Sequence, residues 1–234
     1  MDTISLDRRD LFRAAAASAV AGGVVVTAGE DADAARPSRL RQGDRGWWVQ
    51  NLQRRLLAAH FWLRRADGVF DSTTQQAVMA LQKAHYLGRD GIVGPNTWRA
   101  VYAPKTPRPR TSAAFEIDKA RQLQIVARNG WAQWVFNTST GSGERYWSSS
   151  SGRYLYATTP GGTFRFTRAI DGMRNAPLGK LWRPRYFNGG IAIHGSPSIP
   201  GYPASHGCAR LSDPAINYIW SKNLAPIGRT VKVY

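Results

Sequence analysis

Two residues whose chemistry suits acyl transfer stand near the C-terminal end of this 234-residue chain. Cys208 is the only cysteine, so no other cysteine of the chain can hold it in a disulfide. His194 lies 14 residues earlier, at the end of a short apolar segment that reads as a strand. A thiol becomes a strong nucleophile when a neighbouring imidazole accepts its proton. We therefore predict that Cys208 is a nucleophile and that His194 is its general base.

The residues around Cys208 can supply the other groups that acyl transfer requires. Gly207 permits a tight backbone, so the amide N–H groups of His206, Gly207 and Cys208 are candidates for an oxyanion hole. Arg210 can hold a substrate carboxylate through two parallel hydrogen bonds. His206 is the second candidate for the general base, and a purely structural role in its own loop is the alternative.

A further candidate substrate contact precedes His194. Residues 182–187 read Trp-Arg-Pro-Arg-Tyr-Phe, and these aromatic and cationic side chains suit a peptide that carries carboxylates. Tyr186 is our candidate substrate-binding residue in this loop, which would form one wall of the cleft. An ordinary packed loop is the alternative.

The four histidines do not form a metal-site pattern. No His-x-His or His-Glu-x-x-His spacing occurs, and a single cysteine excludes zinc sites built on several thiolates. His60 and His85 read as ordinary surface or core residues. We predict a reaction that needs no metal and no other cofactor.

Cys208 and His194 fall in a segment, residues 115–234, with a β pattern. Its strand-like stretches are residues 115–137, 164–166, 191–193 and 231–233, and residues 141–151 form a Ser/Gly-rich loop. One helix is predicted, with Ser212 or Asp213 as its cap and Pro214 in its first turn. We expect a mostly-β domain, either a sandwich or a barrel.

Residues 39–102 read as a small all-α domain instead. Ser72 and Gln75 form a capping-box pattern at the start of a second helix, and Pro95 opens a third. Asp-Gly turns at 67–68 and 90–91 precede these helices as a weak internal repeat. Apolar residues recur at helical spacing at positions 49, 52 and 56 and again at 77, 81 and 84. We expect a three-helix bundle, joined to the β domain by a Pro/Arg-rich linker over 103–114.

The first 34 residues have the order of features of an export signal. Arg8 and Arg9 precede Leu-Phe, an apolar stretch follows at 14–28, and Ala32-Asp33-Ala34 is a small-residue cleavage pattern. The paired arginines resemble the twin-arginine signal, which exports folded proteins. No run of 18 apolar residues predicts a transmembrane helix. We expect an exported bacterial protein that is periplasmic or associated with the cell wall.

The charge of the remaining chain favours polyanionic partners. Residues 37–234 carry 28 basic and nine acidic residues, so the anionic cell envelope would attract the protein. An arginine-rich genome is the alternative reason for this composition. No nucleic-acid-binding motif appears, so we do not expect a nucleic acid partner.

Motifs in residues 39–102 resemble the peptidoglycan-binding-like domain. The resemblance implies a three-helix module that binds glycan strands of the wall, and its matched positions belong mostly to the core and turns. The matching pieces are Gly43-x-x-Gly46-x-x-Val49-x-x-Leu52-Gln53, Asp67-Gly68-x-Phe70, Thr74-x-x-Ala77-Val78-x-x-Leu81-Gln82, and Asp90-Gly91-Ile92-Val93-Gly94-Pro95-x-Thr97-Trp98. Asp71 departs from the family pattern, which usually has glycine there; the change affects a helix cap more than the core.

Residues 115–234 resemble the L,D-transpeptidases. The motif is His194-Gly195 followed by Ser205-His206-Gly207-Cys208-x-Arg210, with Thr159-Pro160-x-Gly162-x-Phe164 upstream. The resemblance adds Ser205 and Gly195 to the residues that shape the site.

The resemblance also implies a reaction on peptidoglycan stem peptides. Cys208 would attack the carbonyl before the terminal D-Ala of a tetrapeptide stem, and the amine of a second stem would resolve the thioester into a 3→3 cross-link. His194 would take its orientation from a backbone carbonyl at Gly195 or beyond; Asp171 and Asp213 are acidic alternatives.

Two other functions remain open from the sequence. An L,D-carboxypeptidase or endopeptidase would use the same Cys-His pair, with water resolving the thioester. A non-catalytic wall-binding protein would carry an inert thiol. Product analysis separates the first from a transpeptidase, and thiol reactivity separates the second.

Overall fold

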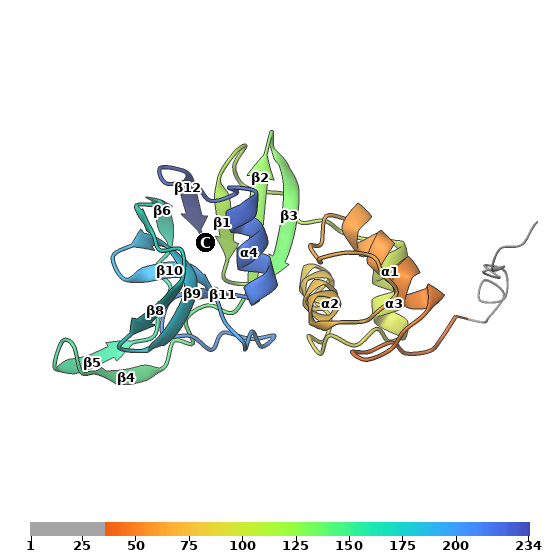
Figure 1. The fold of residues 1–234 in the computed structure, drawn as a ribbon, viewed down its shortest axis with the longest axis horizontal. Helices are drawn as coiled ribbons and strands as arrows, with labels where there is room; N and C mark the ends of the chain where they lie inside the picture. Colours follow the sequence, from red (N-terminus) through yellow and green to blue (C-terminus); the bar gives the residue numbers. More distant parts are fainter. Residues whose placement is uncertain (1–35) are drawn as a thin grey trace, which may run out of the picture. The chain divides into compact units, whose positions relative to one another are not determined.

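The computed structural model describes residues 36–234 (Figure 1). The predicted export signal falls outside these residues. The described part consists of a helical region followed by a mostly-β region, which confirms the predicted fold class. No helix in this part is long and apolar enough to cross a membrane.

The helical region contains three helices, α1 (Trp47–Ala58), α2 (Ser72–Ala84) and α3 (Pro95–Tyr102). α3 begins at the proline that the sequence singled out. The start of α2 differs from the predicted capping box, since Asp71 is the N-cap and its carboxylate accepts the amide N–H of Thr74 at 2.8 Å. A carboxylate at this position is also stabilised by the positive end of the helix dipole. Asp71 therefore has a capping function.

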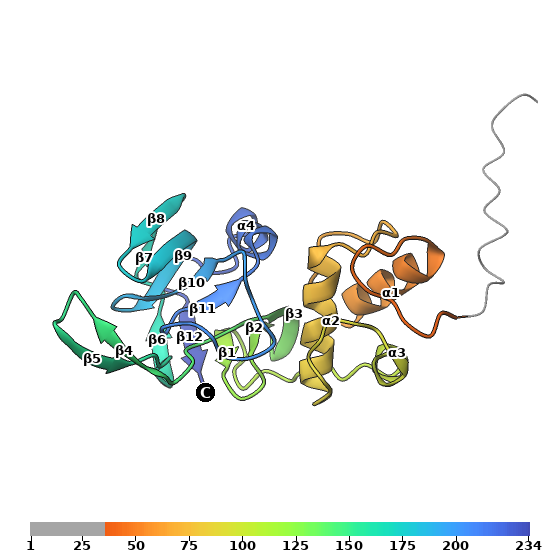
Figure 2. The same ribbon diagram turned by 90° about the horizontal axis from the view of Figure 1, so that it is seen from below.

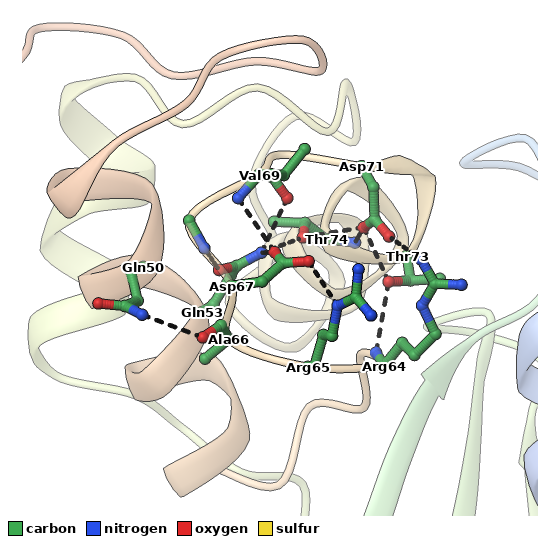
Figure 3. Close-up of polar contacts among 11 residues, drawn as sticks. Gln50, Gln53, Arg64, Arg65, Ala66, Asp67, Val69, Asp71, Thr73 and Thr74 are labelled. Carbon is green, nitrogen blue, oxygen red and sulfur yellow. Dashed lines mark hydrogen bonds and ion pairs between the residues drawn. The ribbon is translucent and has the colours of Figure 1, made fainter.

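The weak repeat of Asp-Gly turns corresponds to a repeated hydrogen-bond pattern. Buried Gln53 accepts the N–H of Gly68 at 2.8 Å and donates to the carbonyl of the next residue at 2.9 Å (Figure 3). Gln82 accepts the N–H of Gly91 at 2.9 Å and donates to the carbonyl of the next residue at 3.0 Å. Each glutamine thus satisfies a turn whose polar groups would otherwise be unpaired.

The β region contains two five-stranded sheets and one hairpin. In the first sheet the strand order is β3-β2-β1-β12-β6; in the second it is β11-β10-β9-β7, with β8 also paired to β9. The hairpin β4–β5 extends from the edge of the β region in both views (Figures 1 and 2). The bounds are β1 Phe115–Asp118, β2 Leu123–Arg128, β3 Trp131–Asn137, β4 Arg145–Ser148, β5 Arg153–Tyr156, β6 Gly162–Arg165, β7 Arg168–Ala169, β8 Met173–Ala176, β9 Gly179–Asn188, β10 Ile191–Gly195, β11 Ala209–Leu211 and β12 Thr230–Val233.

A single helix, α4 (Asp213–Ser221), packs against the second sheet. Ser212 is its N-cap and accepts the amide N–H of Ala215, and Pro214 lies in the first turn, as the sequence predicts. Ile216 and Ile219 of α4 pack in one core with Ile193, at the centre of β10, and Leu211, at the end of β11. This core holds β10, which carries His194, and β11, which follows Cys208.

The helical and β regions share a second apolar core. Leu56, Phe61 and Leu81 pack in one cluster with Ile125 and Val135 of the first sheet. Residues 103–114 contain no helix or strand. The segment that the sequence indicates as a linker therefore joins two regions that also contact each other directly.

Candidate functional site

A parallel pairing of two short strands places the strand of His194 beside the strand that follows Cys208. In this pairing, Ile193 lies opposite Ala209 and His194 lies opposite Arg210. Cross-strand partners share a face of the sheet, and side chains two residues apart along a strand share it as well. Cys208 therefore lies on the His194 face, immediately before β11. The 14-residue separation in sequence is closed by one strand pairing.

The ring of His194 is buried and held by a backbone carbonyl. Its Nδ1 lies 2.7 Å from the carbonyl oxygen of Gly195. A carbonyl can only accept, so Nδ1 carries the proton and Nε2 keeps its lone pair. Burial, with a smaller contribution from the charge of Arg210, lowers the pKa of His194 to about 4 against the opposing effect of the Gly195 bond. The imidazole is neutral at neutral pH and ready to accept a proton.

Neither acidic candidate orients His194 among the described residues. Asp171 accepts a hydrogen bond from Arg183 Nε at 2.6 Å. Asp213 lies against Gly195, but its buried Oδ1 has no hydrogen-bond partner within residues 36–234. The carbonyl of Gly195 is the group that holds the ring.

The thiol of Cys208 is half-buried and protonated at rest. Burial raises its pKa, and this effect exceeds the opposing influence of the Ala192 backbone N–H and of Arg210. Its Sγ lies 3.8 Å from the carbonyl oxygen of Gly190, a weak donor contact. At rest the thiol and the imidazole are therefore both neutral, and the proton would move only as the nucleophile attacks.

The backbone before Cys208 is fixed by three short hydrogen bonds. Ser205 Oγ donates to the Cys208 carbonyl at 2.5 Å and accepts the Gly207 N–H at 3.0 Å. The Gly207 carbonyl accepts the Thr159 hydroxyl at 2.6 Å. Gly207 has φ of 137°, a left-handed conformation that requires glycine. Since its N–H is engaged by Ser205, the amides of His206 and Cys208 are the remaining oxyanion candidates.

His206 and Arg210, two further predicted site residues, differ in their contacts. The exposed ring of His206 packs edge-on against Tyr146 at 4.8 Å, which gives it a contact outside the Cys-His pair. Arg210 takes part in no ion pair among residues 36–234, so its guanidinium is available for a substrate carboxylate. The geometry therefore favours His194 over His206 as the base.

The segment that the sequence placed as a cleft-lining loop is part of strand β9. Tyr186 is 4% exposed, pairs in register with Ala192, and lies beneath the guanidinium of Arg168 at 3.9 Å. Its partner Ala192 lies two residues before His194, so the Tyr186 ring is on the His194 face of the sheet. The ring is almost fully buried there, and direct contact with substrate stays a prediction.

Hairpin β4–β5 approaches the site, and its strand β4 occupies part of the segment 141–151 that the sequence predicted as a Ser/Gly-rich loop; residues 149–152 are its exposed turn. Gly141 at its base forms a bridge with Ser205 and donates its N–H to the Thr159 hydroxyl at 2.9 Å. Its outer face presents three exposed aromatic rings, Trp147, Tyr154 and Tyr156. The aromatic residues on both sides of the Ser-Gly turn were the available signal for a pair of strands.

No second catalytic centre emerges from the described residues. Residues 36–234 contain no group of three or more His, Cys, Asp or Glu side chains that could hold a metal. A cavity of about 500 Å³ lies between the β2–β3 turn and the end of α4, lined by Arg128, Lys222 and Arg229 among others. None of its lining residues belongs to the segment around Cys208.

Comparisons with known proteins agree with this arrangement. Residues 112–233 match the family model YkuD, the L,D-transpeptidase catalytic domain, and residues 48–101 match PG_binding_1, a peptidoglycan binding domain. The crystal structure of the L,D-transpeptidase (residues 123–326) from Xylanimonas cellulosilytica DSM 15894 is 44% identical, with a TM-score of 0.80 over 85% of this chain and 98% of that chain.

A curated relative matches only the helical region. N-acetylmuramoyl-L-alanine amidase CwlL from Bacillus licheniformis is 42% identical over 76 residues, which are 32% of this chain and 21% of that protein. The chain thus spans about a fifth of the length of this relative.

Proposed function

Because the chain belongs to the L,D-transpeptidase catalytic domain family, we propose that it is a peptidoglycan L,D-transpeptidase that forms 3→3 cross-links through a thioester on Cys208. One observation carries the proposal. His194 is fixed in the tautomer that leaves Nε2 free, on the strand that pairs with the strand following Cys208.

Acylation begins when Sγ of Cys208 attacks the carbonyl carbon of the stem's third residue. His194 Nε2 accepts the thiol proton as the C–S bond forms, and the amides of His206 and Cys208 stabilise the oxyanion. His194 then donates this proton to the amine of the leaving D-Ala as the C–N bond breaks. The product is a thioester, which conserves the energy of the cleaved amide, so the reaction needs no cofactor.

Deacylation reverses the roles with a new amine. The side-chain amine of a second stem attacks the thioester carbonyl while His194 accepts its proton. The C–S bond breaks, Cys208 leaves as a thiolate and regains its proton from His194. The neutral resting state of the pair supports this cycle, since an imidazole with a pKa of about 4 returns a proton readily to sulfur.

Arg210 is the proposed anchor for a stem carboxylate. It lies opposite His194 on the paired strand, and no carboxylate of residues 36–234 forms an ion pair with it. A guanidinium binds a carboxylate through two parallel bonds and so orients the donor peptide. The helical region would hold the enzyme on glycan strands, which places the proposed site of action in the cell wall after export.

Intact-mass spectrometry with a carbapenem tests the nucleophile. The strained amide of a carbapenem acylates an activated thiol, so we expect one adduct on the wild-type protein and none on Cys208→Ala. His206→Ala is the matched control and retains the adduct if His194 is the base. An unmodified wild-type protein, folded and reduced, would rule out the cysteine mechanism.

Incubation with a tetrapeptide stem and a second stem then separates the reactions. A cross-linked dimer supports the transpeptidase, whereas release of D-Ala with only a tripeptide product indicates a carboxypeptidase.

A further inference from the structure

We propose that the helical region is part of the catalytic apparatus, in that Lys83 and Arg89 position the two segments that flank the nucleophile. This inference rests on the proposed cysteine acyl transfer. Lys83 is a positioning residue: it holds Thr138, and Thr138 in turn holds β11. Arg89 acts on the loop that joins His194 to Cys208.

Lys83 of α2 is fully buried against the first sheet. Its ammonium donates to the carbonyl of Thr138 at 2.8 Å, to the carbonyl of Gln122 at 3.0 Å and to the side-chain oxygen of Asn137. All three acceptors are neutral, and burial lowers the pKa of Lys83 to about 7, with a smaller contribution from the charge of Arg89. A buried cation without a carboxylate is costly. The fold therefore depends on these hydrogen bonds to keep the buried amine paired.

Thr138 connects this lysine to the strand that follows the nucleophile. Its hydroxyl donates to the carbonyl of Arg210 at 2.7 Å, and the N–H of Arg210 donates to the carbonyl of Ser139 at 3.0 Å. The pair of bonds fixes β11 against the end of β3. Cys208 lies two residues before Arg210, so a shift of residues 138–139 would move both the nucleophile and the proposed carboxylate anchor.

Arg89 makes the second connection, to residues 196–204. Its guanidinium donates to the carbonyl of Gly201 at 3.1 Å. The backbones also touch, because a Cβ placed on Gly201 would lie 2.7 Å from both Cβ and the carbonyl oxygen of Arg89. Asn137, which accepts from Lys83, reaches the same loop through the Ile199 carbonyl at 3.4 Å. The helical region thus contacts the connection between His194 and Cys208 directly.

Both contacts lead to the nucleophile, and neither involves the core of the helical bundle. A misplacement of about 1 Å in a reacting group can cost about 100-fold in rate. Loss of either contact should therefore slow the acylation step. A flexible tether between independent domains would give no such effect.

Full-length variants test this. Lys83→Met removes the three donated bonds at similar side-chain length, and Gly201→Ala pushes the loop off Arg89. Val49→Ala is the control: Val49 is fully buried in α1 and makes neither contact. Saturation kinetics of Cys208 acylation by a carbapenem, well below each melting temperature, give a limiting rate and a half-saturation concentration. We expect the limiting rate to fall about 10- to 100-fold in the first two variants and to stay at the wild-type value in Val49→Ala.

Hydrogen exchange of the peptide that spans residues 205–211 provides a readout that does not depend on the chemistry. Faster exchange in Lys83→Met and Gly201→Ala, but not in Val49→Ala, supports the positioning role even if the wild-type thiol takes no carbapenem, an outcome that would remove the proposed function alone. Wild-type rates and exchange in both folded variants would overturn the inference. Equal losses in all three variants would do the same, since they would indicate general destabilisation.

Discussion

Replacing His194 by glutamine should separate two kinds of thiol reactivity in Cys208. If the resting pair is neutral, alkylation by iodoacetamide follows the intrinsic thiol ionisation, whereas acylation by a carbapenem depends on proton transfer to His194. His194→Gln should leave the pH profile of alkylation nearly unchanged. The same variant should lose about 10²- to 10⁴-fold in acylation rate, the usual contribution of a general base.

The population of a thiolate–imidazolium pair in the resting protein follows from the two pKa values. An ordinary thiol has a pKa of about 8.5, and His194 has a pKa of about 4, so proton transfer between the isolated groups costs about 6 kcal/mol. Attraction between the resulting charges at about 4 Å returns about 4 kcal/mol at the effective dielectric constant of protein sites. About 2 kcal/mol remains, so the ion pair has a population of about 3%. Because burial raises the thiol pKa further, this population is an upper bound.

The assay is the second-order rate of alkylation between pH 5 and 10, followed by intact mass. We expect a rate at pH 7 that is at most a few per cent of the high-pH limit, with a rise that continues beyond pH 8.5. A preformed thiolate–imidazolium pair would instead give a high, flat rate from about pH 5 to 8, collapsing in His194→Gln. That profile would refute the neutral resting state.

Four other changes have definite expected results. Gly195→Ala places a Cβ 2.5 Å from Asp213 Oδ1, so we expect a loss of about 1–3 kcal/mol in urea unfolding together with slower acylation. Thr159→Val loses the hydroxyl bond that fixes the turn before the nucleophile, and acylation should slow while secondary structure by circular dichroism is retained. Gln53→Leu leaves a turn amide unpaired and should lower the free energy of unfolding by about 1–3 kcal/mol, with the acylation rate unchanged. Lastly, the folded state binds fewer protons at His194 than the unfolded state between pH 6.5 and about 4, so stability falls on acidification; the loss is about 3 kcal/mol in wild type and is missing in His194→Gln, as urea titrations at pH 7 and pH 4 would reveal.

Local sequence signals predicted the helices well. Pro95 and Ser212 mark helix starts through backbone properties that do not depend on distant residues. His194 and Cys208 stand in a motif whose spacing encodes one strand pairing. Ser72 and Asp71 are both good N-cap residues, and in the structure Asp71 is the N-cap. Residue type alone does not decide between two adjacent capping residues.

Long-range contacts account for what the sequence did not reveal. Tyr186 is of a residue type that often binds ligands, but its burial depends on neighbouring strands of the sheet, including Arg168 of β7, whose guanidinium covers its ring. Lys83 occupies a helix position where lysine normally faces water, and its burial depends on residues 39 and 55 positions later in the chain. The Pro-rich segment over 103–114 indicated a spacer, but local composition does not report whether the joined regions touch.

The neutral thiol of Cys208 also has a consequence for the lifetime of the protein under oxidising conditions, such as those of the proposed site of action. Peroxides and disulfides react with thiolates and hardly with thiols, so a cysteine that stays protonated at neutral pH is oxidised slowly. A preformed thiolate would be a better resting nucleophile and a shorter-lived one. In the oxidising surroundings of a cell wall, where we propose that this protein acts, no second cysteine could reduce a sulfenic acid. A nucleophile that ionises only during attack on the substrate would therefore keep the proposed active site through many idle periods.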